Sequence, residues 1–237
     1  MSWLEAPMVG FDTETTGVNP QTDRIVTASL EWINADATRV SGQWIINPGV
    51  EIPTSATAVH GITNDRVQAE GAAPAVALEE ITVALAEAMR AGFPAVAFNA
   101  SYDFTILEAE NARHGVPTLA SRLGGEVAPV VDPLVLDKQV DRYRRGKRVL
   151  TIVAEHYGVS LVEAHDAQAD ARAAVQLVPA IALAHPELAA MSPAELHQAQ
   201  VRWRAEQQTS LREYFQRSGN DAAAASVSTA WPLEPGH

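Results

Sequence analysis

The segment MVGFDTETTG, residues 8–17, predicts a strand that ends in a Thr-Gly turn. Asp12 and Glu14 are separated by one residue, so on a strand both side chains point to the same face of the sheet. Two carboxylates on one face repel one another unless a cation lies between them, and such hard oxygen ligands suit Mg²⁺ or Mn²⁺. The alternative is a strand end whose acids simply face water.

Further strands are predicted on the C-terminal side of this segment. Residues 24–33 and 40–47 are rich in β-branched and aromatic residues and are bounded by the turn signals GVNPQTD and NADAT. With the first strand they predict a three-strand antiparallel meander. The short apolar runs at 93–99 and 128–133 predict two more strands.

Helical patterns alternate with the later strands. Helices are predicted over residues 74–91, 103–114, 149–157, 167–184 and 192–217, the last opened by Ser192 as N-cap with Glu195 three positions on. The order predicts an α/β fold in which helices flank a mixed sheet, the meander plus parallel strands. We therefore expect a catalytic domain over 1–185, a helical extension over 186–217 and a disordered tail over 218–237.

Composition narrows the class of protein. The chain has 237 residues, of which 47% are hydrophobic and none is cysteine, so thiolate metal sites and disulfides are excluded. No stretch approaches the roughly 18 apolar residues of a membrane span, and the N-terminus lacks the pattern of a signal peptide. These features predict a cytoplasmic globular protein with no membrane partner.

The formal charge of −12 argues against tight, nonspecific binding of duplex nucleic acid. It does not argue against a site in which metal ions supply the positive charge. The basic residues are also unevenly spread, because KQVDRYRRGKR at 138–148 holds six of them against one acid.

Two later segments add candidate ligands. Asp103 follows the strand predicted at 93–99 and opens a helix, where Asp is also a preferred N-cap. Asn99, at the end of that strand, is either a turn residue or a support for a site. His165 and Asp170 are five residues apart, about 140° of arc at roughly 100° per helical residue, so they do not share a face of one helix.

We therefore expect His165 on the loop before the helix and Asp170 on its first turns, which places an imidazole beside a carboxylate. Asp166 competes with Asp170 as a ligand, and spacing alone does not choose between them. For either His165 or Asp170 alone, a surface position is the simpler interpretation. Together we expect the acids of the first strand, the middle segment and the late helix to converge at one edge of the sheet. That arrangement suits two-metal phosphoryl transfer, with the ions about 3.5–4 Å apart.

Over roughly residues 7–184 the sequence resembles the DEDDh 3′→5′ exonucleases, the group that contains the proofreading epsilon subunit of bacterial replicases. The matching motifs are FDTETTG at 11–17, HGITNDRV at 60–67, FNASYDFTIL at 98–107 and HDAQADA at 165–171. The His-x₄-Asp form of the last motif distinguishes this group from relatives that carry Tyr there.

The resemblance implies a ribonuclease-H-like fold and two Mg²⁺ or Mn²⁺ ions in the active site. It implies that the metal-holding carboxylates are Asp12, Glu14, Asp103 and Asp170, which selects Asp170 over Asp166. His165 is implied as the general base toward the attacking water. The implied reaction releases nucleoside 5′-monophosphates from the 3′ end of a nucleic acid, preferentially single-stranded DNA.

Substrate contacts are also implied. The resemblance assigns the terminal nucleotide to Thr13, Thr15, Thr16, His60, Gly61 and Ile62. Asn99 is a further candidate for substrate binding. Phe104 either stacks on a base or packs in the core. The basic stretch, with Arg145 and Arg148 as the named contacts, either follows the substrate backbone or forms a solvated loop.

Partner and pathway stay open at this point. The region beyond 185 does not resemble a polymerase-binding tail, so a stand-alone exonuclease for DNA repair and a proofreading subunit are both candidates. QTSLREYF at 208–215 has the spacing of sliding-clamp peptides and also suits an amphipathic helix on its own domain. The competing functions are an RNA-trimming exonuclease with the same site, which recognition of a 2′-OH would distinguish, and a catalytically silent binding or adaptor module. The complete set of acids with His165 argues against the silent module.

Overall fold

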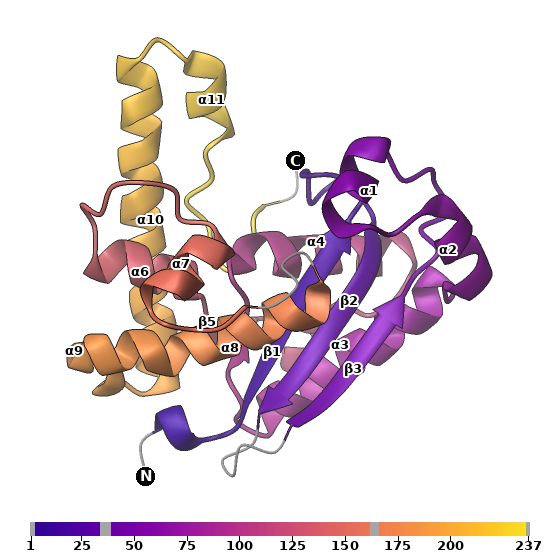
Figure 1. Cartoon of the computed structure of the whole chain (residues 1–237), viewed down its shortest axis with the longest axis horizontal. Helices are drawn as coiled ribbons and strands as arrows, with labels where there is room; N and C mark the ends of the chain where they lie inside the picture. The colour runs from indigo at the N-terminus through magenta and orange to yellow at the C-terminus, as the bar shows by residue number, and fades with distance from the viewer. Residues whose placement is uncertain (1–2, 34–38, 162–165, 236–237) are drawn as a thin grey trace.

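A five-stranded mixed sheet lies at the centre of the computed structural model (Figure 1), which describes residues 3–33, 39–161 and 166–235, apart from the Glu5 side chain. The strands are β1 (Met8–Thr15), β2 (Ile25–Ile33), β3 (Arg39–Ile45), β4 (Ala95–Val96) and β5 (Val130–Val131). Their order is β3-β2-β1-β4-β5, antiparallel from β3 to β1 and parallel from β1 to β5. The predicted meander and added parallel strands are confirmed.

Helices flank the sheet as predicted. Their bounds are α1 (Thr54–His60), α2 (Asn64–Glu70), α3 (Pro74–Arg90), α4 (Ala100–Arg113), α5 (Leu119–Leu123), α6 (Pro133–Val140), α7 (Leu150–His156), α8 (Ala167–Ala184), α9 (Pro186–Ala189), α10 (Pro193–Arg217) and α11 (Asp221–Ser226), after a 3₁₀ turn η1 (Trp3–Glu5). The sequence did not predict the short helices α1, α2, α5, α6 and α9, because none is long enough to show a clear apolar period. None of the described helices has the length and apolarity needed to cross a bilayer.

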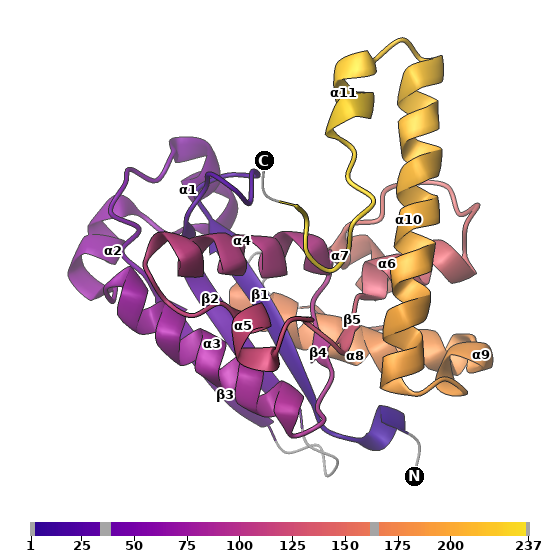
Figure 2. The same ribbon diagram turned by 180° about the vertical axis from the view of Figure 1, so that it is seen from behind.

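The two faces of the sheet are covered by different helices (Figures 1 and 2). Val9 and Phe11 of β1 join a core with α3 and α4, whereas Met8 joins a core with α8. Side chains alternate along a strand, so Asp12 and Glu14 lie on the α8 side of β1. The strand periodicity thus directs both acids toward the helix that carries the last motif.

Helix α8 lies unusually close to β1 at Gly10. A Cβ atom at Gly10 would lie 2.6 Å from the backbone oxygen of Ala171 and 2.7 Å from Cγ2 of Val175. Contact between strand and helix backbones at this distance is open to glycine alone among the residues. Because Asp170 precedes Ala171 in α8, this contact also fixes how closely Asp170 approaches β1.

The register between β1 and β2 shifts just beyond the acids. Glu14 pairs with Thr27 but Thr15 pairs with Ile25, so β2 has one extra residue at this point. Such bulges bend a strand and redirect its side chains, and they occur often beside active sites. Here the bulge ends the pairing where the Thr-Gly turn begins.

Helix α10 covers the β5 edge of the sheet. His197 accepts the Val130 N–H at Nδ1 (3.1 Å), and the Gln200 side chain both accepts from the Asp132 N–H (2.7 Å) and donates to the Val130 carbonyl (3.0 Å). An uncovered edge strand would present unpaired backbone groups. The predicted capping box of Ser192 and Glu195 opens this helix.

The expectation of a disordered tail is wrong for residues 218–235. This segment forms α11 and then an extended stretch in which Trp231 is buried, with its ring centroid 5.1 Å from that of His197. The Glu234 N–H donates to Thr105 Oγ1 on α4 (2.9 Å). The buried Trp231 side chain attaches this segment to the domain. The prediction failed because it relied on the average composition of the segment, which is small and polar.

We predict that Gly10→Ala lowers the free energy of unfolding by about 1–3 kcal/mol, because the added methyl group must displace the backbone of α8. Urea denaturation followed by circular dichroism measures the change. Gly42→Ala is the matched control, since the three atoms nearest its Cβ would all belong to the side chain of Trp44 and none to a backbone. Equal destabilisation of the two variants would show that the contact at Gly10 is not special.

Candidate active site

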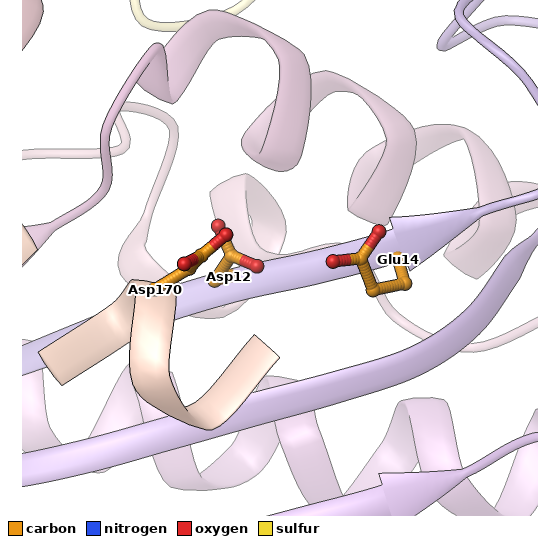
Figure 3. A group of neighbouring side chains, drawn as sticks. All are labelled: Asp12, Glu14 and Asp170. Atoms are coloured by element: carbon orange, nitrogen blue, oxygen red, sulfur yellow. The ribbon is translucent and has the colours of Figure 1, made fainter. Parts of the chain in front are cut away.

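Three carboxylates meet where β1 and α8 are closest. Oxygen atoms of Asp12, Glu14 and Asp170 lie within 4.8 Å of one another. Figure 3 shows Asp12 and Glu14 projecting from the same side of β1, with Asp170 reaching them from α8. The sequence predicted that Asp12 and Glu14 share one face of the strand. It also predicted that Asp170 joins them from the first turns of the helix.

Asp103 comes to the same region from α4. The helix begins at Ala100, so Asp103 lies in its first turn and is not the N-cap that the sequence offered as an alternative. It is buried, and its Oδ1 accepts hydrogen bonds from the Thr13 N–H (3.1 Å) and Thr13 Oγ1 (2.7 Å). These bonds attach the start of α4 to β1 and leave the Asp103 charge beside the other acids.

A second buried carboxylate holds the start of α4 in place. Asn99 adopts a left-handed backbone with φ of 66°, and Asp132 accepts the N–H groups of Asn99 and Ala100 (3.0 Å each). Asp132 also caps α6 by accepting the Leu134 N–H (2.9 Å). Sequence analysis placed Asp132 only at the end of a predicted strand. The Asp-Pro pair that opens α6 was the signal for its capping role.

Asp166 and Asp170 have separate roles at the start of α8. Asp166 is the N-cap and accepts the N–H groups of Gln168 (3.1 Å) and Ala169 (3.0 Å), whereas Asp170 joins the carboxylate cluster. Of the two acids whose spacing left the choice open, Asp170 is the one that lies in the carboxylate cluster. His165 lies outside the described residues and directly precedes the cap in the chain.

Burial and mutual repulsion make the acids hard to ionise together. Burial, followed by the charges of Asp170, Asp103 and Asp166, raises the pKa of Glu14 to about 8. Burial and the neighbouring acids raise the pKa of Asp12 well above its usual range. Burial raises the pKa of Asp103 to about 7 despite its bonds from Thr13. A divalent cation would relieve this repulsion, and an all-oxygen donor set fits a hard cation.

The acids line an open cavity of about 500 Å³. Its remaining lining includes Thr13, Asn99, Phe98, Tyr102, Leu134, Arg148, Val149 and Leu150. The Tyr102 hydroxyl donates to the Gly17 carbonyl (2.5 Å) and lies 2.7 Å from Thr15 Oγ1, so it holds the Thr-Gly turn against α4. The sequence reasoning missed Tyr102 although it stands inside the second matching motif.

Thr16, His60, Gly61 and Ile62, which were also predicted to bind substrate, do not line this cavity. His60 and Ile62 line a smaller cavity of about 120 Å³ that also contains Glu14, and Gly61 ends α1 in a left-handed conformation. His60 Nδ1 accepts the Ile62 N–H (3.0 Å). Thr16 bonds to Asp23 (3.0 Å), so it stabilises the turn that carries β1 into the loop.

Phe104 does not reach the cavity, which corrects its assignment to substrate. Its side chain is fully buried, and its ring centroid lies 5.5 Å from that of Phe11 in the core between β1 and α4. Neighbouring residues of a helix point in different directions, so Phe104 packs in the core while Asp103 joins the acids. The alternative of core packing is therefore the right one.

The two arginines predicted to contact substrate, Arg148 and Arg145, differ in position and burial. Arg148 lines the main cavity, and its Nη1 lies 2.7 Å from Oδ2 of the buried Asp137. Arg144 contacts the same oxygen (2.6 Å), so Asp137 orders this part of the loop. Arg145 is exposed on that loop.

A family model described as exonuclease (RNase_T) matches residues 9–178. The PolC-type DNA polymerase III of Streptococcus thermophilus is 29% identical over 177 residues, which are 73% of this chain and 11% of that protein. A DNA polymerase III subunit epsilon-like protein of Rhodobacter capsulatus is 46% identical over 74 residues, 29% of this chain and 10% of that protein.

Among solved structures, exonuclease I of E. coli in complex with a dT13 oligonucleotide has a similar fold, with a TM-score of 0.63 at 17% identity over 77% of this chain and 42% of that chain. Fold, acidic cluster and motifs thus define a 3′→5′ exonuclease of the DEDDh group, with a ribonuclease-H-like fold. The chain belongs to the exonuclease family. Family membership and the carboxylate cluster indicate dependence on a divalent metal.

We predict that the metal-free protein loses stability as pH rises. The folded-state pKa values of Glu14 (about 8) and Asp103 (about 7) exceed the ordinary values of 4.5 and 3.8, so folding favours their protonated forms. That contribution is fully present below the ordinary pKa values and is lost as pH rises through about 7 and 8. Thermal unfolding in EDTA, from pH 5 to pH 8, measures the decline.

Adding Mg²⁺ or Mn²⁺ should raise Tm more at pH 8 than at pH 5, because the cation binds the ionised cluster. Asp12→Asn should remove most of that rise. Glu87→Gln is the control, because it removes one exposed carboxylate on α3, on the opposite side of the sheet from α8 (Figure 2). A Tm that is independent of metal at both pH values would contradict a cation site at these residues.

Proposed function

We propose that the chain hydrolyses the terminal phosphodiester bond at the 3′ end of single-stranded DNA and releases nucleoside 5′-monophosphates. In this proposal two Mg²⁺ or Mn²⁺ ions are held by Asp12, Glu14, Asp103 and Asp170, and His165 is the general base. The observation that carries the proposal is the convergence of carboxylates from β1, α4 and α8 on one cavity, with burial and repulsion raising the pKa of Asp12, Glu14 and Asp103.

The bound ions supply the charge that activates water and stabilises the leaving 3′ oxygen. The protein residues position the reacting strand. Thr13 fixes Asp103, Tyr102 fixes the Thr-Gly turn, and the mixed apolar and polar lining of the main cavity is suited to a nucleotide. His165, next to the N-cap of α8, would accept the proton of the attacking water.

DNA is the favoured substrate on the evidence of the relatives. The similar polymerases are DNA polymerases, and the similar E. coli exonuclease I is described with a dT13 oligonucleotide. This chain spans 11% of the polymerase and 42% of the exonuclease I chain, so the likeness concerns the nuclease domain. The same proposed activity would serve proofreading beside a polymerase or DNA repair.

We predict that a 5′-labelled single-stranded DNA is shortened from its 3′ end in Mn²⁺ or Mg²⁺ and stays intact in EDTA. Asp12→Ala should stop the reaction, because it removes a ligand from the centre of the cluster. A denaturing gel displays the products, and an RNA of the same sequence tests the sugar. Faster degradation of the RNA would reverse the substrate assignment, and no degradation of either strand in any metal would favour a binding module.

We predict that His165→Ala lowers kcat by roughly 10²–10⁴-fold, as removal of a general base does. The rise of Tm on adding Mn²⁺ should persist in this variant, because His165 holds no metal in the proposal. Single-turnover rates across pH 5 to pH 9 give the measurement. A variant with near wild-type rates would exclude His165 as the base, and a variant without the metal-dependent rise in Tm would instead make it a ligand.

A further inference from the structure

A second large cavity lies between α10 and the loop that joins α6 to α7. Its volume is about 490 Å³. In both ribbon views this loop runs beside α10 (Figures 1 and 2). We call this cavity the α10 groove, defined by Lys138, Gln139, Arg142, Tyr143, Arg148, Glu206, Gln207, Gln208, Ser210, Leu211 and Tyr214.

The α10 groove is basic although the protein carries a net charge of −12. Three cations, Lys138, Arg142 and Arg148, line it against the single carboxylate of Glu206. Lys138 and Arg142 form no ion pair within 4.0 Å among the described residues, whereas Arg148 is held by Asp137. Burial, and then the nearby Arg204 charge, lower the pKa of Lys138. Arg142, which is exposed, is thus the cation most accessible to an anion, and Lys138 adds a second charge when it is protonated.

Aromatic and amide side chains accompany this charge. Tyr143 is 87% exposed and Tyr214 is 59% exposed, and the Arg142 guanidinium lies 6.0 Å from the centroid of the Tyr143 ring. Gln139, Gln207 and Gln208 add hydrogen-bonding groups, and Gln207 is fixed by its bond to the Val135 carbonyl (3.1 Å). Exposed aromatic rings interleaved with cations are typical of surfaces that bind single-stranded nucleic acid by base stacking and phosphate contact.

The α10 groove and the active-site cavity share one lining residue. Arg148 lines both the α10 groove and the cavity that contains Asp12, Asp103 and Asp170. A strand whose 3′ end lies at the carboxylates therefore has a basic path toward α10. One wall of that path comes from α10, which lies beyond residues 9–178, the part matched by the family model.

The segment 208–215 also lies on this wall. It resembles a sliding-clamp peptide in spacing, yet it is part of the long helix α10, with Leu211 and Tyr214 exposed and lining the groove. Leu211 (39% exposed) and Tyr214 (59% exposed) are thus only partly packed onto their own domain, and Phe215 is half-buried. The exposure of Leu211 and Tyr214 is explained if they face a ligand in the groove.

We propose that the α10 groove binds the single-stranded nucleic acid several nucleotides upstream of the 3′ end that enters the active site. Arg142 and Lys138 contact phosphates, and Tyr143 and Tyr214 stack on bases. The groove thereby holds the strand between successive cleavage steps. This proposal rests on the proposed function for the direction of the strand, but the binding itself does not require hydrolysis.

The first test measures binding in EDTA, where no cleavage occurs. Fluorescence anisotropy of a labelled dT15 strand is compared for the wild type and the triple variant Arg142→Ala, Tyr143→Ala, Tyr214→Ala. All three side chains are exposed, so their removal should leave the fold intact. We expect Kd to rise about tenfold or more because stacking is removed. The slope of log K against log salt should fall by about 0.7 for each phosphate that the variant no longer neutralises.

Three controls distinguish the effects of base stacking, of net charge and of hydrolysis at the active site. Tyr143→Phe with Tyr214→Phe should keep wild-type affinity, because the stacking rings remain. Arg90→Ala removes one charge on α3, on the other face of the sheet, and should change neither affinity nor salt slope. Hydrolysis of the p-nitrophenyl ester of thymidine 5′-monophosphate, too short to reach the groove, should be equal in wild type and triple variant.

The outcomes are distinct. Weaker binding by the triple variant supports the groove even if no protein hydrolyses the ester, in which case only the proposed activity fails. Unchanged affinity and salt slope in the triple variant would overturn the groove proposal, whatever the activity, and would point to a protein ligand for this surface. An equal decrease of affinity in Arg90→Ala would also overturn it, because the effect would then be one of net charge.

Discussion

The contact between α8 and β1 at Gly10 determines the geometry of the active site. The pleat of β1 puts Asp12 and Glu14 on one face, but they form a site only when a third element brings another acid to that face. With no Cβ at Gly10, the backbone of Ala171 can lie directly on the strand, and Asp170 is carried with it. The Thr-Gly turn, the bulge between β1 and β2, and helix α4 then enclose the carboxylate cluster. The contact at Gly10 has set the position of that cluster.

That geometry places like charges together in a poorly solvated site. Burial is the largest cause of the raised pKa at Asp12, Glu14 and Asp103, and repulsion between neighbours adds to it at Asp12 and Glu14. A cluster of this kind lowers stability unless a cation occupies it, and functional sites often carry such strain. Charge of opposite sign is thus concentrated in two regions of the molecule. Acids lie at the end of β1, and cations line the α10 groove. A nucleic-acid strand and its metal ions would complement both regions.

Local sequence predicted what local physics controls. Strand alternation predicted the shared face of Asp12 and Glu14, and the Ser192 capping box predicted the start of α10. Features that depend on distant contacts were missed or misplaced. The start of α4 is set by Asp132, the N-cap of α6, so that Asp103 lies inside α4, and the tail is ordered by the burial of Trp231. No local pattern in the sequence records which distant group will satisfy a helix terminus or cover an aromatic ring.

The proposed function requires that the carboxylate cluster hold two divalent ions. Anomalous diffraction from crystals grown with Mn²⁺, recorded on both sides of the manganese edge, tests it most directly. We predict two anomalous peaks among Asp12, Glu14, Asp103 and Asp170, about 3.5–4 Å apart. No peak at these residues, or manganese bound only elsewhere on the protein, would contradict it.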